Sequence, residues 1–80
     1  MTTMRAKLQI SSIEQFPTSE RLKFQAVAAK SYPADGSDED NTYAKFSPQA
    51  DFTITITNPA LLGQFKAGEK YYVDFTPAAS

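Results

Sequence analysis

The chain of 80 residues contains no cysteine and no histidine. Without cysteine it forms no disulfide, and without either residue it has no thiolate or imidazole with which to bind a metal. Nucleophilic catalysis by a Ser–His or Cys–His pair is excluded for the same reason. We therefore expect no metal and no cofactor.

The chain also lacks an excess of basic residues and a long apolar run. Eight Lys and Arg against nine Asp and Glu give a formal net charge of −1, whereas a domain that binds polyanions in general is clearly basic. A small net charge leaves weak self-repulsion, which is compatible with a homo-oligomer. No segment has the apolar length of a signal peptide or a membrane span, so we expect a cytoplasmic protein with no membrane partner.

The main pattern in the sequence is a strict alternation of apolar and polar residues. Residues 5–11 place Ala6, Leu8 and Ile10 on one face, and residues 21–28 place Leu22 and Phe24 inward. A short polar loop joins the two segments, so they predict an antiparallel hairpin. Because Ile13 is out of phase, we expect a bulge or a strand end at positions 11 and 12.

The last third of the chain gives the firmest prediction. Residues 52–57 and 70–76 both alternate, with Phe52, Ile54 and Ile56 in one segment and Tyr71, Val73 and Phe75 in the other expected to face the core. Between them Asn58 suits a helix N-cap, Pro59 the first helical position, and Gly63 a left-handed end. Gly68 suits a turn. We predict strand, one helical turn, tight turn, strand.

These segments, with a short third strand expected over residues 42–46, predict a single mainly β domain over residues 1–80. One helical turn cannot cover the apolar face of a flat sheet. We therefore expect a small five-stranded antiparallel barrel or roll, or a sheet that pairs its apolar face with another subunit. A second copy could also add to an exposed edge. Residues 31–41, with Pro33, Gly36 and four acidic residues, predict a flexible acidic loop.

The two hairpin strands share the pattern Arg, apolar, Lys, apolar, Gln, beginning at Arg5 and at Arg21. Paired strands would place Arg5, Lys7, Arg21 and Lys23 on one outward face. One interpretation is a platform for phosphates or single-stranded nucleic acid. However, the aromatic residues on which such platforms stack bases are missing from this face. The alternative is a solvated face whose long side chains protect the sheet.

The acidic loop does not have the spacing of an EF-hand in the registers that begin at Asp35 and at Asp38, because the glycine and the last glutamate are misplaced in both. We expect instead either a solvated loop or a loop that orders on a basic partner surface, with Asp38, Glu39 and Asp40 as the candidate contacts. Tyr43 and the outward Tyr72 are the aromatic candidates for a protein contact.

For catalysis only carboxylates and tyrosines are available. No spacing marks a pair of carboxylates that would face each other across a cleft, and there is no glycine-rich phosphate loop. The sequence therefore predicts a protein that is not an enzyme.

Several short stretches together resemble small proteins of tailed bacteriophages. They are Met-Arg-Ala-Lys-Leu at 4–8, Asp-Glu-Asp-Asn at 38–41, Tyr-Ala-Lys-Phe-Ser-Pro at 43–48, Ile-Thr-Asn-Pro-Ala at 56–60 and Phe-Lys-Ala-Gly-Glu-Lys-Tyr-Tyr-Val-Asp-Phe at 65–75. The resemblance implies a viral protein in the cytoplasm of a bacterial host, or one incorporated in the virion.

The preferred interpretation is a non-enzymatic phage accessory or virion-assembly protein that works through protein–protein contacts as a homo-oligomer. The alternatives are a small β-barrel that binds single-stranded nucleic acid, and an inhibitor of a host defence protein whose acidic loop mimics a polyanion.

Overall fold

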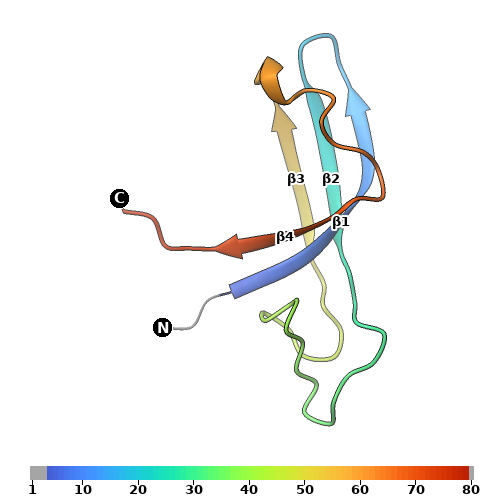
Figure 1. Ribbon diagram of the computed structural model, residues 1–80, viewed down its shortest axis with the longest axis vertical. Coiled ribbons are helices and arrows are strands. Elements are labelled where there is room, and N and C mark those ends of the chain that lie inside the picture. Colours follow the sequence, from blue (N-terminus) through green and yellow to red (C-terminus); the bar gives the residue numbers. More distant parts are fainter. Residues whose placement is uncertain (1–3, 80) are drawn as a thin grey trace.

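A computed structural model describes residues 4–79 of the chain as one antiparallel sheet. Its four strands are β1 (Met4–Gln15), β2 (Glu20–Ala26), β3 (Asp51–Ile56) and β4 (Lys70–Phe75), and a 3-10 helix, η1 (Pro59–Leu61), precedes β4. The order across the sheet is β3-β2-β1-β4 (Figure 1). The prediction of a mainly β fold with a helical turn before the last strand is confirmed, and the count of five strands is not. Residues 1–3 and 80 of the expected domain lie outside the described residues.

β1 is longer than expected because it continues through an irregularity instead of ending there. Its pairing with β2 shifts register between Ile10 and Ser12, where the sequence predicted a bulge. The Ser11 hydroxyl donates to the Lys23 carbonyl across this gap, at 3.2 Å. The shift returns Ile13 to the apolar side, opposite Leu22.

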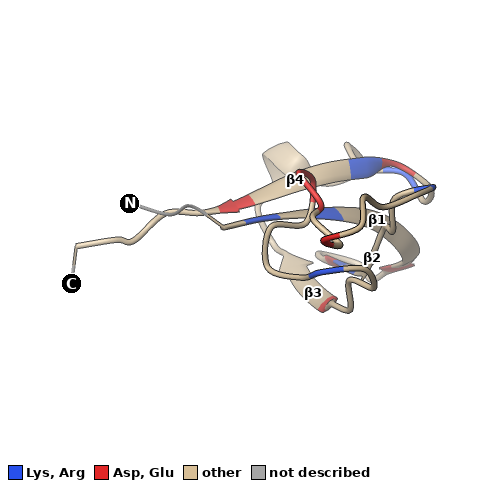
Figure 2. Cartoon of the chain, turned by 90° about the horizontal axis from the view of Figure 1, so that it is seen from below, with Lys and Arg blue, Asp and Glu red and all other residues tan. Residues whose placement is uncertain are grey.

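The sheet is strongly curled. The first half of β1 pairs with β4, from Met4 opposite Phe75 to Gln9 opposite Lys70, and the second half pairs with β2. In Figure 1 the start of β1 and β4 run together at a steep angle to β2 and β3. In Figure 2 the strands follow an arc from β4 through β1 and β2 to β3. The arc does not close, because β3 and β4 are the two edges and are not hydrogen-bonded to each other. The fold is an open half-barrel.

The core lies on the concave side of this arc and is small. Six side chains are buried there, namely Ala6, Leu8, Ile10, Leu22, Phe24 and Ile56. The Phe24 ring meets Phe52 and Tyr71 edge to face, with centroids 5.4 and 6.3 Å apart. Tyr43 and Ala50 from one long connection, and Leu62 and Phe65 from the other, pack against this cluster. Within the part of the chain that the structure describes, the core is covered by connections and not by a second layer of helix or sheet. Within residues 4–79 no helix combines the length and the apolar composition that crossing a bilayer requires.

The connection from β3 to β4 follows the predicted local chemistry. The Asn58 side chain caps η1 by accepting from the Ala60 amide at 3.0 Å, and Pro59 occupies the first turn. Gly63 and Gly68 have φ of 78° and 93°, which glycine adopts without steric cost. Glu20 belongs to the polar loop that the sequence predicts before the second strand, but it is buried, and its Oε1 accepts from the Gly63 amide at 3.4 Å. This contact joins the connection to β2.

The strand expected over residues 42–46 does not form, and that prediction is wrong. Thr42 donates its amide to the Arg5 carbonyl at 2.9 Å, but Ala44 then closes a turn on the Asn41 carbonyl at 3.1 Å. Phe46 has a φ of 63° and donates its amide to the Gly36 carbonyl. The backbone of the segment therefore bonds to the sheet only at Thr42, and its next backbone groups bond within the loop.

Candidate interaction surfaces

Asn41 fastens the acidic loop to the sheet. β2 ends at Ala26, which leaves the Lys7 amide of β1 without a strand partner on that side. The Asn41 Oδ1 accepts from this amide at 2.8 Å, and its Nδ2 donates to the Val27 carbonyl at 2.8 Å and to Asp38 at 3.2 Å. Asn41 is 0% exposed. Sequence analysis did not single it out, because an asparagine in a polar loop carries no periodic signal.

The loop brings together residues that the sequence assigned to two different candidate sites. Asp40 accepts from the Tyr72 hydroxyl at 2.9 Å and lies 3.5 Å from the Lys7 ammonium. Arg5 binds Asp74 with two hydrogen bonds of 2.7 and 3.2 Å, and its guanidinium lies 4.6 Å from the centre of the Tyr72 ring. We call Arg5, Lys7, Asp40, Tyr72 and Asp74 the outer polar cluster.

The charged groups of the outer polar cluster are paired with one another. The hydrogen bond from Arg5 lowers the pKa of Asp74, and the same bond raises the pKa of Arg5. The hydrogen bond to Asp40 raises the pKa of Tyr72, with partial desolvation adding to it. Each shift favours the protonation state present at neutral pH. The cluster is a set of paired charges at neutral pH, in which Arg5 and Asp74 hold the ends of β1 and β4 together.

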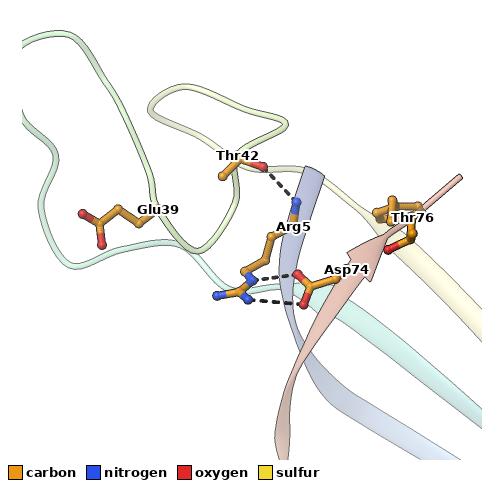
Figure 3. A pocket seen from close by; sticks show the side chains of 6 residues that line it. Arg5, Glu39, Thr42, Asp74 and Thr76 are labelled. Atoms are coloured by element: carbon orange, nitrogen blue, oxygen red, sulfur yellow. Dashed lines mark hydrogen bonds and ion pairs between the residues drawn. The ribbon is translucent and has the colours of Figure 1, made fainter. Parts of the chain in front are cut away.

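A shallow hollow of about 430 Å³ lies beside this cluster, between the strand ends and the acidic loop. In Figure 3 the Arg5 amide is bound to the Thr42 hydroxyl and its guanidinium to Asp74, while Glu39 stands apart on the loop. Glu39 is exposed, as a contact residue requires. Asp38 is instead engaged within the loop, where it accepts from the amides of Asp40 and Asn41.

The other two candidate cations lie at the opposite end of the hairpin. Gln9 is opposite Gln25, so the antiparallel register separates Arg5 and Lys7 from Arg21 and Lys23. Arg21 and Lys23 both approach Glu14, at 3.7 and 3.6 Å. Figure 2 shows basic and acidic segments intermingled over the molecule. The four cations share the outward face, but they form two separate pairs next to carboxylates and no continuous platform.

Tyr43 is turned toward the core. It packs against the buried cluster, and its hydroxyl is buried with no hydrogen-bond partner among the described residues. Desolvation raises the pKa of this hydroxyl. Of the two tyrosines predicted as contacts, Tyr72 is on the surface and Tyr43 is largely a packing residue.

Four of the five large apolar residues that are exposed on the described strands lie on the concave side of the sheet. Met4, Phe52, Ile54 and Phe75 lie on the same side as the core, because each is opposite a core-side residue or another of the four. They are 40, 37, 42 and 49% exposed. The sequence placed Phe52, Ile54 and Phe75 in the core. The side is as predicted, but the half-barrel leaves these residues uncovered at its two margins. We call these four residues the open apolar face.

Comparison with models of protein families, with curated proteins and with solved structures found no match to this chain.

Proposed function

We propose that this is a non-enzymatic protein that works through protein–protein contacts, in an accessory or virion-assembly role of a bacteriophage. The observation that carries the proposal is the open apolar face. Four of the eight large apolar side chains that are exposed among the described residues lie on one side of one sheet. Single exposed apolar residues are ordinary, whereas several on one side of a sheet, here at its two margins, favour an interaction on that side.

The arrangement of charge favours a protein partner. The polar side of the sheet carries cations that already have carboxylate partners, so phosphates would have to displace them. The apolar side offers two phenylalanines and a methionine, residue types that are enriched at protein interfaces. The phage setting, and with it the host cytoplasm or the virion as location, rests on the resemblance of the sequence segments.

Photo-crosslinking in bacteria tests this function. A photoreactive phenylalanine analogue placed at Phe52 or Phe75 should form covalent products with a protein. The same analogue at Phe16, which is 45% exposed but lies in the β1–β2 turn, is the matched control and should form few. In phage-infected cells we expect the product to contain a protein of the particle or of its assembly. Equal products from all three positions, or none from any, would refute the proposal.

A further inference from the structure

We infer that the open apolar face is covered by a second copy of this chain, so that two half-barrels pack with their concave sides together. This inference rests on the proposed function, a protein that acts through protein contacts, and it names the partner.

The exposed surface of one chain is larger than a compact monomer of its mass should have. The chain exposes 6016 Å², whereas a compact monomer of 8.8 kDa is expected to expose about 4,800 Å². The excess of roughly 1,200 Å² is larger than the ~800 Å² that each partner buries in an interface of standard size. The area available therefore suffices for a stable dimer.

The molecule is also more extended than a compact monomer of its length. The extents are 48 × 34 × 16 Å, and the radius of gyration is 14.7 Å, against about 11.6 Å for a compact domain of this length. Domains bury a sheet by packing a second layer on its apolar side. Here the sheet is one layer, partly covered by its own connections, and a second copy supplies the missing layer.

The concave side is chemically suited to contact itself. Among the described strand residues, Glu20 is the only charged one on this side, and it is 2% exposed and bound to the Gly63 amide. The lysines and arginines of the strands face the other way. The strand faces of two copies can therefore approach without bringing like charges of the strands together.

The two margins of the face suggest how the copies meet. Phe52 and Ile54 lie on the edge strand β3, and Phe75 lies on the other edge strand, β4, opposite Met4. In a two-fold dimer every contact occurs twice. The β3 margin of each copy then packs against the β4 margin of the other, and both open sides are filled at once.

Sedimentation equilibrium of the full chain, from micromolar to millimolar concentration, tests the inference. We expect the mass to rise with concentration to twice that of the chain. Ile54→Glu should weaken the dimer at least ~10-fold, because it buries a carboxylate in the apolar contact. Thr55→Glu, the next residue on the opposite side, is the matched control and should change the dissociation constant by no more than about 2-fold.

A second pair of variants keeps the test valid if Ile54→Glu prevents folding. Because the chain has no cysteine, Ile54→Cys and Thr55→Cys each introduce a single thiol. The alkylation rate of Ile54→Cys should fall in proportion to the fraction of free monomer as concentration rises, and the rate of Thr55→Cys should stay constant. Circular dichroism and a cooperative urea transition establish that each variant is folded.

The outcomes separate this inference from the proposed function. A monomer at millimolar concentration, or equal effects at positions 54 and 55, overturns the second copy as partner. If Phe52 nevertheless cross-links to another protein in cells, the proposed function stands and the partner is a different chain. If the chain neither associates nor cross-links, both proposals fail.

Discussion

At the scale of single residues, the Asn41 side chain provides the hydrogen bonds that a neighbouring strand would give to β1 beyond the end of β2. Its side chain satisfies the Lys7 amide and the Val27 carbonyl while being 0% exposed. Asn41→Ala should destabilise the fold by about 1–3 kcal/mol, because both backbone groups lose their partner. Urea unfolding measures this loss.

Asn58→Ala is the matched control for that prediction. Asn58 is the other asparagine of the chain, it is exposed, and it makes a capping bond to the Ala60 amide. The loss of such a cap typically costs ~1 kcal/mol or less in exposed positions. A larger effect at position 58 than at position 41 would mean that the acidic loop is not held by its asparagine.

Asp74 gives the fold a dependence on acid pH. Its bond to Arg5 lowers the pKa of its carboxyl in the folded state, so its contribution to stability is present above the unfolded value of about 3.9 and is lost as pH falls through the lower folded value. Wild type should therefore be more stable than Asp74→Asn at neutral pH, and the difference should shrink below about pH 4. The effect is small because the pair is exposed.

Urea midpoints over a pH series check this prediction. Asp51→Asn is the control, since Asp51 is exposed on β3 and makes no ion pair with any residue that the structure describes. A difference between wild type and Asp74→Asn that stays constant from neutral to acid pH would contradict the assignment.

At the scale of elements, the loop between β2 and β3 is closed by a contact between Gly36 and Phe46. Both Gly36 and Gly63 have positive φ, 75° and 78°, but a Cβ at Gly36 would overlap the Phe46 ring, whereas at Gly63 it would meet nothing within 4 Å. The two alanine variants share the backbone strain, about 1–2 kcal/mol, and differ in this clash. Gly36→Ala should be the more destabilising in urea unfolding, and equal losses would show that the ring moves aside freely.

The same elements show which features of the fold can be predicted from local sequence. The bulge in β1, the Asn58 cap and the turns at Gly63 and Gly68 were predictable because each depends on a residue and its neighbours. The strand over 42–46 was not, because the amides of Ala44 and Phe46 bond to carbonyls of Asn41 and Gly36 within the loop and not to another strand. The burial of Glu20, a residue of the polar loop expected between the first two strands, was not predictable either, because nothing local indicates its bond to Gly63, 43 residues away.

At the scale of the whole molecule, the sequence predicted which side each strand residue faces but not which neighbours it meets. Tyr72 was expected outward and is, yet its bond to Asp40 joins residues 32 positions apart. Ile54 was expected on the apolar side and is, yet whether that side is covered depends on the closure of the arc. Which charges pair, and which apolar side chains are covered, depends on the assembled sheet and cannot be predicted from the alternation of residues alone.

The pairing of charge over the whole molecule leads to a prediction about nucleic acid. Each of the four outward cations of the hairpin lies next to a carboxylate, and the net charge is −1. The chain should therefore not bind labelled single-stranded DNA at micromolar protein and moderate salt. Glu14→Gln releases Arg21 and Lys23 together, and it should raise the affinity at low salt more than Glu39→Gln. That control changes the net charge equally but frees no hairpin cation.

Binding of single-stranded DNA by the wild type would instead favour the nucleic-acid function. In that case the logarithm of the affinity should fall against the logarithm of the salt concentration with a slope of about 0.7 per phosphate contact.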